Sequence, residues 1–456
     1  MRFDNFSQMI AYHGAKNAQR TAVLFAEHNE VREVRWEDFA KAVEQKVQKL
    51  RIMDNSCVGL YADPSPAWIL HLFAAAIAGK RVVLLDPALP PEAVEPLMAD
   101  TGVDFLFCDR PERLQKLRPA VQRNLLAYKE RGGKKQDVEC AGELLFYTSG
   151  TTRQGKAVVL SQKALCSSCW NGQQLLPATR QDVVLSLLPL NHVFGFVCCM
   201  LWPLSQGAAV AIGRGARYYG EDLMLFRPSV LPVVPTLLKY LLQVGRINEN
   251  LRAILVGAGP AQAEILEAAA RKGIEVRFGY GLTETASGLA MSARGEDPFL
   301  MTPCPEVQLR VDEEGQLYVR TTCMMDGYYH LPGDTGRVLK DGELATGDLA
   351  EQEEDGRIRI LGRVDDVIVF PNGQKVFCPD LEKTLARKIG TQVALTVREG
   401  QLTLVAVGDH RMLQEAQDAV DEENRHRTRE QQIIRVEMRD EPFPRTANGK
   451  LRRFMI

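Results

Sequence analysis

The sequence lacks an excess of charge of either sign, because 56 lysines and arginines stand against 58 aspartates and glutamates. The resulting formal net charge of -2 gives no electrostatic reason to expect binding to a nucleic acid or an anionic membrane. At 456 residues, the chain is long enough for about three average domains. We therefore expect a large protein with an interdomain cleft and no nucleic-acid partner.

Long hydrophobic runs are also absent. The most apolar stretch, 67–79, is interrupted by His71 and is shorter than the roughly 20 residues that a membrane-spanning helix needs. The opening residues, MRFDNFSQMIAYHGAKN, lack a basic flank followed by an apolar run, so they do not resemble a signal peptide. The sequence thus predicts a buried helix at 67–79, no membrane span and a cytoplasmic location.

Regularly spaced cysteines are the third absence. The ten cysteines show no fixed spacing, and without an export signal they are expected to be reduced thiols. Cys166 and Cys169 form a single C-x-x-C with no second pair and no nearby histidine. Packing is therefore a better interpretation of these two residues than a zinc or redox site.

Short apolar segments that alternate with helical stretches indicate an α/β fold with buried strands. Examples are VGLYAD, RVVLLDP, DFLFCD, ELLFYTSG and RAILVGAG. From about residue 303 the expected strands become shorter and more polar, as in EVQLRVDEEGQLYVR. The pattern predicts a large N-terminal domain of layered α/β sheets at 1–363, which includes a β subdomain at about 303–363.

Residues 364–456 have a different character. VALTVREGQLTLVAVG has the alternation of a hairpin that turns at 399–400, and a charged, helix-like segment follows at 412–432. We expect a small, mobile α+β C-terminal domain in this part of the chain. No repeat or low-complexity linker precedes it, so its hinge must be a few residues near 364–366.

The strand ELLFYTSG leads into TTRQGKAVVLS, a loop of glycines and hydroxyl groups that contains Lys156. Glycine lets backbone N–H groups approach a phosphate, hydroxyls add donors and lysine adds charge, so a polyphosphate is the expected ligand. A flexible polar turn is the competing interpretation. Residues 150–156 also fit the start of a P-loop, but Ala157 stands where that motif needs a Ser or Thr to hold magnesium.

Several further segments follow this loop in a fixed order: LPLNHVFGF, ILVGAGP, GYGLTET, ATGDLAEQEEDGRIRILGRVDD and PRTANGKLRR. Together with YTSGTTRQGKAVVLS, they resemble the motif series of the adenylate-forming acyl-CoA synthetase family, whose phosphate loop usually reads YTSGTTGxPKGVxxS. The chain is identified as a member of this family over nearly its whole length. DVIVFPNGQKVFCPDLE is nearest in style to the fatty acyl-CoA synthetases.

The resemblance implies how ATP would be bound. Tyr280 would pack beside adenine, Asp348 would accept hydrogen bonds from both ribose hydroxyls, and Arg363 would lie near the same sugar. Taken alone, a buried tyrosine or an acidic turn residue is commonplace. The full implied set of ATP-binding residues is Thr148, Ser149, Gly150, Thr151, Thr152, Lys156, Gly257, Ala258, Gly259, Tyr280, Gly281, Thr283, Asp348 and Arg363.

The resemblance also implies catalytic residues. Glu284, beside Thr283, offers Mg²⁺ a carboxylate oxygen, although Thr-Glu also suits the start of a helix. Lys450 would stabilise charge on the pentavalent phosphorus, although a lysine so near the chain end is usually solvated. His192 would border the acyl site, and a structural role suits it equally. Asp365 matches the family's hinge residue.

The implied reaction is ATP-dependent activation of a carboxylic acid to acyl-AMP, with release of pyrophosphate and then transfer to the thiol of coenzyme A. ATP, Mg²⁺ and coenzyme A are the expected cofactors. An acyl carrier protein is the alternative acceptor, and a nucleotide-binding protein without turnover is the alternative class. That alternative arises because Arg153, Gly155 and Ala157 depart from the family's phosphate loop.

The resemblance to this family also indicates which kind of acid is the substrate. Amino-acid-activating members of the family place an aspartate where this chain has Asn191 and His192. An aspartate there would pair with the substrate ammonium group, so its absence disfavours an amino-acid substrate. A fatty or other apolar acid is the expected substrate.

Overall fold

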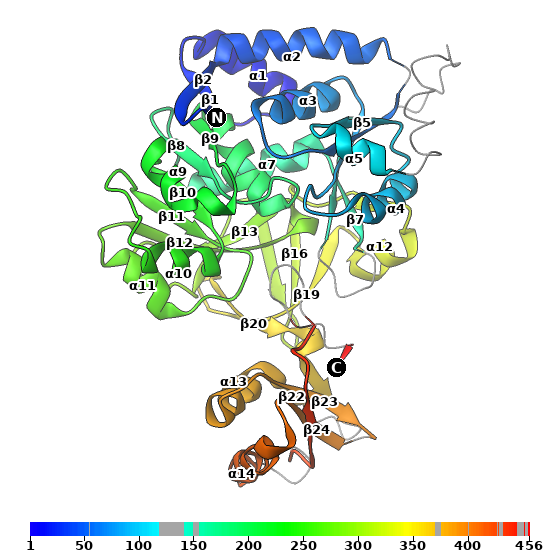
Figure 1. Ribbon diagram of the computed structural model, residues 1–456, viewed down its shortest axis with the longest axis vertical. Coiled ribbons are helices and arrows are strands. Elements are labelled where there is room, and N and C mark those ends of the chain that lie inside the picture. Colours follow the sequence, from blue (N-terminus) through cyan, green and yellow to red (C-terminus); the bar gives the residue numbers. More distant parts are fainter. Residues whose placement is uncertain are drawn as a thin grey trace.

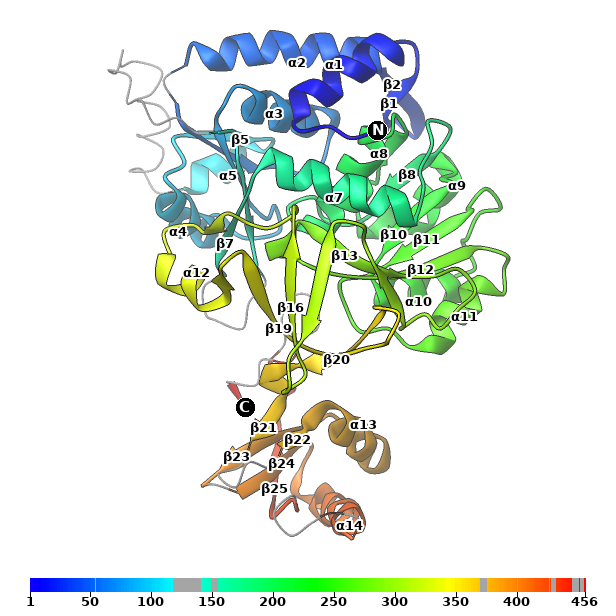
Figure 2. The ribbon, with the colours of Figure 1, turned by 180° about the vertical axis from the view of Figure 1, so that it is seen from behind.

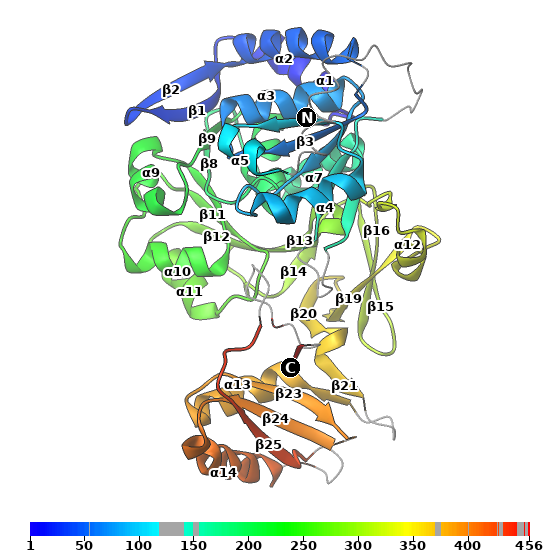
Figure 3. The ribbon, with the colours of Figure 1, turned by 45° about the vertical axis from the view of Figure 1, so that its right-hand side comes forward.

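The computed structural model describes most of the chain, with several gaps. The described residues are 1–53, 55–117, 141–148, 155–369, 375–399, 401–425, 427, 432–444, 451 and 455–456. Their secondary structure alternates strands and helices through the first 363 residues, as the apolar segments predicted. A smaller group of elements follows and, in all three ribbon views, lies beyond the end of β20 (Figures 1, 2 and 3).

A six-stranded sheet forms one layer of the larger part, in the order β17-β7-β6-β4-β3-β5. Its strands are β3 (Cys57–Tyr61), β4 (Arg81–Leu84), β5 (Phe105–Cys108), β6 (Leu144–Tyr147), β7 (Ala157–Leu160) and β17 (Gly327–Tyr328). The chain pairs β3, β4, β5 and β6 in parallel and then turns back, so that β6 and β7 are antiparallel. The helices of this region are α3 (Pro66–Ile77), α4 (Pro91–Thr101) and α5 (Pro111–Lys116).

A 14-stranded sheet forms the second layer, and its first half is mainly parallel. This half comprises β1 (Thr21–Glu27), β2 (Glu30–Arg35), β8 (Val183–Ser186), β9 (Ala209–Ile212), β10 (Val230–Val233), β11 (Ala253–Val256) and β12 (Glu275–Leu282). Its helices are α1 (Phe6–Lys16), α2 (Trp36–Arg51), α7 (Gln162–Leu175), the π-helix η1 (Gly195–Leu201), α8 (Trp202–Ser205), η2 (Ala216–Tyr218), α9 (Tyr219–Phe226), α10 (Pro235–Gln243) and α11 (Ala263–Ala270). Figure 1 shows α1, α2 and α3 together at one end of the molecule.

The other half of this sheet is antiparallel. It comprises β13 (Ser287–Ser292), β14 (Met301–Pro303), β15 (Val307–Val311), β16 (Gln316–Thr321), β18 (Leu339–Lys340), β19 (Glu343–Gln352) and β20 (Ile358–Arg363). The connecting elements are η3 (Thr283–Thr285) and α12 (Pro332–Val338). Antiparallel pairing already begins between β12 and β13, which is earlier than the β subdomain predicted at about 303–363.

The smaller part has its own apolar core, formed by residues such as Val376, Leu385, Leu404 and Val420. Its elements are η4 (Val364–Asp366), β21 (Val367–Val369), β22 (Lys375–Phe377), α13 (Cys378–Ile389), β23 (Val393–Arg398), β24 (Gln401–Val407), η5 (His410–Met412), α14 (Leu413–Asn424) and β25 (Arg435–Arg439). The predicted fold class, a large layered α/β part with a small C-terminal α+β domain, is confirmed. The exact boundary after residue 363 and the mobility of the small domain stay predictions.

Of two local predictions in the small domain, the structure confirms the hairpin and shortens the helix. The predicted hairpin is present, because β23 and β24 pair up to Arg398 and Gln401; Gly400 lies outside the described residues. The charged helix predicted at 412–432 is shorter, since α14 ends at Asn424. The Asn424 side chain accepts a hydrogen bond from the Ile433 N–H and donates one to the Ile433 carbonyl, both at 2.9 Å, and so directs the chain toward β25.

The apolar stretch predicted as a buried helix forms α3, where Leu72 and Phe73 are fully buried. Among the described residues, no helix is long and apolar enough to cross a bilayer. Cys166 and Cys169 lie buried in α7, where burial raises the pKa of the Cys166 thiol to about 12. In the described part of the chain, no group of metal-ligating side chains surrounds them.

A hydrogen-bonded ionic network around the buried Asp182 joins the amino-terminal ends of three parallel strands. Asp182, Ser229 and Arg252 immediately precede β8, β10 and β11. Asp182 accepts hydrogen bonds from Arg252 at 2.8 Å and from Ser229 at 2.7 Å. Burial alone would raise the pKa of Asp182, but the hydrogen bonds from Arg252, Ser229 and Thr179 outweigh burial and lower the pKa to about 2.

This network predicts a pH-dependent loss of stability. We expect Asp182→Asn to lower the free energy of unfolding by about 1–3 kcal/mol at pH 7, because hydrogen bonds to a charged group are lost. The folded state holds the carboxylate deprotonated more strongly than the unfolded state does. The difference in unfolding free energy between the wild type and Asp182→Asn should therefore reach its maximum above about pH 4, near the ordinary pKa of aspartate. It should shrink as the pH falls toward 2.

Urea titrations at pH 7 and pH 3 measure this difference. The matched control is Asp297→Asn, which removes an exposed ion pair with Arg359 and should change stability little. Equal effects of the two substitutions, or a gap that does not depend on pH, would contradict the role given to Asp182.

Candidate active site

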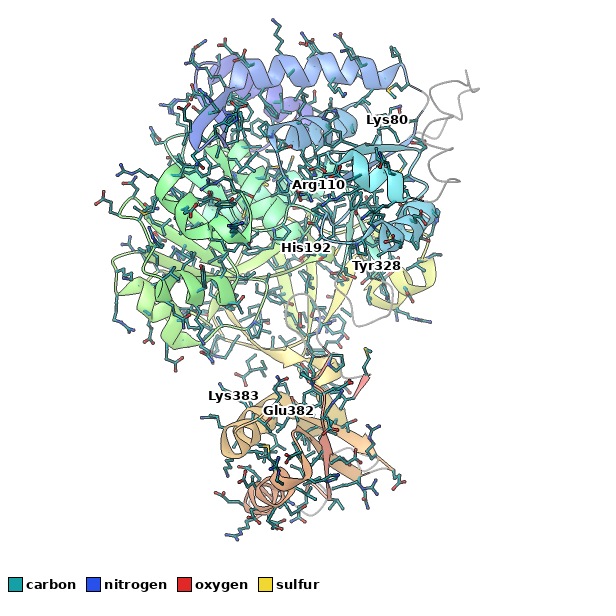
Figure 4. All side chains as sticks on the ribbon, in the orientation of Figure 1. Lys80, Arg110, His192, Tyr328, Glu382 and Lys383 are labelled. Carbon is teal, nitrogen blue, oxygen red and sulfur yellow. The ribbon has the colours of Figure 1, made fainter. Side chains whose placement is uncertain are left out.

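The candidate site is a cavity of about 1940 Å³. Its walls come from the ends of β6, β11 and β12, from the antiparallel half of the large sheet and from α13 of the small domain. Ligands of α/β proteins settle beyond the carboxyl ends of parallel strands, where connecting loops converge. Figure 4 labels His192 and Tyr328 in the larger part of the molecule and Glu382 and Lys383 in the smaller part; all four residues line the cavity.

Most of the predicted residues that the structure describes line this cavity. They are Thr148, Lys156, His192, Ala258, Gly259, Tyr280, Gly281, Thr283, Glu284, Asp348 and Arg363. Gly257 is an exception, because it lies behind the wall, where an added Cβ would come 3.2 Å from the Phe194 ring. Asp365 belongs to η4 at the junction of the two parts. The following predicted residues lie outside the described part of the chain: Ser149, Gly150, Thr151, Thr152, Arg153 and Lys450.

The base of the candidate phosphate loop is closed by two hydrogen bonds between Thr148 and Lys156. The Thr148 N–H donates to the Lys156 carbonyl at 2.9 Å, and the Lys156 N–H donates to Thr148 Oγ1 at 3.3 Å. Gly155 passes so close to the Thr148 carbonyl that any Cβ at this position would overlap its oxygen. A residue with a Cβ at position 155 would therefore require the base of this loop to shift.

Lys156 is held by groups that the sequence did not reveal. Its Nζ lies 3.1 Å from Asp334 Oδ2, at the start of α12, and 4.7 Å from the centre of the Tyr328 ring. The lysine side chain is 29% exposed, so it faces the cavity and is not sealed in the core. A bound phosphate would compete with Asp334 for this ammonium group.

Glu284 lies in η3, the short helical turn that joins β12 to β13. Its carboxylate accepts a hydrogen bond from Tyr328 Oη at 2.8 Å, and its backbone carbonyl accepts one from the Met325 N–H at 2.8 Å. Burial, and then the charge of Glu284, raise the pKa of Tyr328, so the phenol stays protonated and donates. One carboxylate oxygen is thus held by Tyr328, and Glu284 lines the cavity, where its carboxylate suits a hard cation.

No cluster of three or more metal-ligating side chains occurs among the residues that the structure describes. Mg²⁺ does not need such a cluster, because it commonly takes one or two carboxylates and completes its shell with waters and substrate phosphates. The single carboxylate of Glu284 next to the candidate phosphate loop fits this coordination.

The opposite side of the cavity is organised around the buried carboxylate of Asp348. Tyr280 Oη donates to Oδ2 at 2.6 Å, and Arg363 Nη1 donates to Oδ1 at 2.8 Å. Asp348 and Arg363 are direct partners in the β19–β20 register. Burial, and then the charge of Asp348, raise the pKa of Tyr280 well above its usual range, so Tyr280 remains a donor at neutral pH.

His192 lies in the turn between β8 and η1 and lines the cavity. The His192 N–H donates to the Pro189 carbonyl at 3.3 Å, and the Phe196 N–H donates to the His192 carbonyl at 2.8 Å. Burial lowers the pKa of the His192 ring, and the nearby charge of Asp86 acts in the opposite direction. The ring is therefore neutral at pH 7.

Sequence reasoning missed Tyr328, Asp334 and Thr346. Thr346 Oγ1 accepts from the Asp348 N–H at 3.1 Å and donates to the Leu317 carbonyl at 2.7 Å, which fixes the backbone at Asp348. The strand-like GYYH before Pro332 signals a strand–helix junction. It does not reveal that β17 pairs with β7, which brings Tyr328 to Glu284.

Comparisons with known proteins show which family and which fold the chain shares. The description "AMP-binding enzyme" applies to the family whose profile matches residues 10–329. A 2-succinylbenzoate–CoA ligase of a Geobacillus strain is 27% identical over 360 residues, which cover 73% of this chain and 72% of the relative. Long chain acyl-CoA synthetase 4 of Arabidopsis thaliana is 24% identical over 455 residues, which cover 76% of this chain and 68% of the relative.

A solved structure has the same fold. The o-succinylbenzoate coenzyme A synthetase of Bacillus subtilis, in complex with AMP, aligns over 100% of this chain and 98% of its own, with a TM-score of 0.80 and 20% sequence identity. The same enzyme in complex with ATP and a magnesium ion gives a TM-score of 0.79 at 19% identity, with 98% of each chain aligned.

The fold and the cavity define a nucleotide-binding enzyme with a large and a small part. Because the profile match spans more than half of its residues, the chain belongs to the AMP-binding enzyme family. The adenylate-forming acyl-CoA ligase family recognised in the sequence motifs, and the predicted class of AMP-forming ligase, are confirmed. The roles of individual residues are proposals.

The β12–β13 connection predicts how sensitive the site is to backbone crowding. The register of this pair shifts between Tyr280 and Gly281, and a Cβ on Gly281 would overlap the Ser287 carbonyl oxygen. We expect Gly281→Ala to cost about 3 kcal/mol of unfolding free energy, because a backbone clash cannot relax by side-chain rotation. Gly288→Ala is the matched control, since a Cβ there would meet nothing within 4 Å. Chemical denaturation of both variants checks this, and equal stabilities would contradict it.

Proposed function

We propose that the protein activates a carboxylic acid with ATP to form acyl-AMP and pyrophosphate, and then transfers the acyl group to the thiol of coenzyme A. One observation carries the proposal: a single cavity joins Lys156, Glu284 and the Asp348–Arg363 pair. These groups suit a triphosphate, a hard cation and a ribose, in that order. The names of the two curated relatives, both coenzyme A ligases or synthetases, support the same reaction.

In the first step, a carboxylate oxygen attacks the α-phosphorus, and the bond from that phosphorus to the bridging oxygen of pyrophosphate breaks. Lys156 would exchange Asp334 for a phosphate oxygen and offset the developing charge. Asp348, fixed by Tyr280 and Arg363, would accept from the ribose hydroxyls. Glu284 would hold Mg²⁺, which as a bound Lewis acid neutralises phosphate charge.

In the second step, the thiol attacks the acyl carbonyl and AMP leaves with the bonding electrons. We propose that the small domain changes its position between the steps about Asp365, and that Lys450 serves the first step. Burial keeps the ring of His192 uncharged beside the acyl side, where a neutral ring can accept a proton or orient the acid.

We propose that the acyl portion of the acid lies against the part of the cavity wall that α7, η1, α8 and β13 form. We call the following set the acyl wall: Ser168, Gly172, Val197, Cys198, Trp202 and Ser287. None of these side chains carries a charge, and a second carboxylate in the acid would be buried against them without a partner. This argues for an acid with a single carboxylate, fatty or aromatic, and disfavours 2-succinylbenzoate, which has two.

Two alternatives to this function remain, one with a different acyl acceptor and one without catalysis, and each predicts a different measurable product. An acyl carrier protein presents the same pantetheine thiol as coenzyme A, and a non-catalytic paralogue would bind ATP without releasing pyrophosphate. The deciding experiment measures pyrophosphate release with a panel of acids, and thioester formation with coenzyme A or a purified carrier protein. Release of pyrophosphate with thioester on coenzyme A supports the proposal. Nucleotide binding without pyrophosphate release for every acid would overturn it.

Glu284 provides a prediction for the metal. Glu284→Gln keeps the size and one oxygen but removes the charge, so the Mg²⁺ concentration for half-maximal activity should rise about tenfold or more. Tyr328→Phe is the matched variant, because it removes the hydroxyl that donates to Glu284 and leaves the carboxylate charge in place. It should have the smaller effect on the Mg²⁺ requirement. A Mg²⁺ titration of Glu284→Gln that overlays the wild type would make Glu284 a structural residue.

A further inference from the structure

Ser168 is a buried polar group without a partner in the wall of the cavity. It lies in the middle of α7, is 3% exposed and belongs to the acyl wall. Within the described part of the chain, its Oγ has no hydrogen-bond partner. Buried hydroxyls are nearly always paired, and an orphan in a native protein requires an explanation.

The helix itself does not use this hydroxyl. A serine inside a helix commonly donates to a carbonyl three or four residues earlier. Other buried hydroxyls in this protein do so: Thr101 donates to the Leu97 carbonyl at 2.6 Å, and Ser205 donates to the Trp202 carbonyl at 2.7 Å. Ser168 makes no such bond, so its donor and acceptor capacity is available to a group in the cavity.

Open space lies next to this hydroxyl. Gly172 is four residues further along α7 and therefore on the same face, and a Cβ at Gly172 would meet nothing within 4 Å. Ser287 also belongs to the acyl wall, but Cys198 Sγ lies 3.7 Å from its Oγ, so that hydroxyl already has a partner. Ser168 is thus the unpaired hydroxyl of this wall.

We propose that Ser168 recognises a neutral hydrogen-bonding group, such as a hydroxyl, ketone or amide, on the acyl portion of the acid. This inference rests on the proposed function. The group must be neutral, because one hydroxyl does not compensate a buried charge and the acyl wall contains no cation. The substrate class is therefore an otherwise apolar acid with one neutral polar substituent, and not a plain hydrocarbon acid or a dicarboxylate.

The test uses pairs of acids with one carbon skeleton, with and without a hydroxyl or keto group. Pyrophosphate release with ATP gives kcat/KM for each acid. We expect the wild type to prefer a substituted acid. Ser168→Ala should lower kcat/KM for that acid about tenfold, the effect of roughly 1.4 kcal/mol, and change it less than about twofold for the plain acid.

Two further variants serve as controls for the effect of Ser168→Ala. Ser205→Ala removes a buried, paired hydroxyl that does not line the cavity, and should leave the preference between the acids unchanged. Gly172→Leu fills the adjacent space, so it should lower kcat/KM for both members of a pair alike. Without acid, Ser168→Ala should unfold at the wild-type temperature or above it, because no bond is lost in the free protein.

Three results would overturn the inference while leaving the proposed function intact. They are a wild type that prefers the plain acid in every pair, equal losses for both acids in Ser168→Ala, and a lower unfolding temperature of that variant without acid. Absence of pyrophosphate release with every acid would instead overturn the proposed function, and this inference with it.

Discussion

The buried carboxylate of Asp348 is the constraint on which the site depends. A charge inside a protein must be paired, and here the partners come from two other strands, Tyr280 on β12 and Arg363 on β20. β12 ends the parallel half of the large sheet, whereas β19 and β20 belong to the antiparallel half. The hydrogen bond from Tyr280 to Asp348 therefore adds a side-chain link between the two halves beside the cavity.

The charged side chains near the candidate phosphate loop are also paired, although they are more exposed than Asp348. Lys156 is paired with Asp334, and Glu284 accepts from Tyr328, so each charged group has a partner before any ligand arrives. Binding can then exchange partners, and the side chains need little further ordering. In the proposed reaction, Lys156 and a Mg²⁺ ion held by Glu284 would offset charge on the departing pyrophosphate from groups that are already positioned.

The sequence predicts the parts of the site that lie within continuous motifs. Gly281, Glu284, Asp348 and Arg363 could be assigned because each belongs to a segment with a recognisable order of residues. Tyr328 could not, because its role depends on the pairing of β17 with β7, two segments far apart in the sequence. The predicted length of α14 was wrong for a similar reason. The helix ends at Asn424, whose side chain accepts a hydrogen bond from the Ile433 N–H.

The two ends of the parallel strands serve different purposes. At the amino-terminal ends, Asp182 accepts hydrogen bonds from Thr179, Ser229 and Arg252, which favours stability. Beside the cavity, Gly281 leaves no room for a Cβ, and the buried Ser168 hydroxyl is unpaired, which costs stability in the free protein. Under the proposal that a polar substituent of the acid pairs with Ser168, the ligand would recover this cost, and this part of the cavity would discriminate between acids.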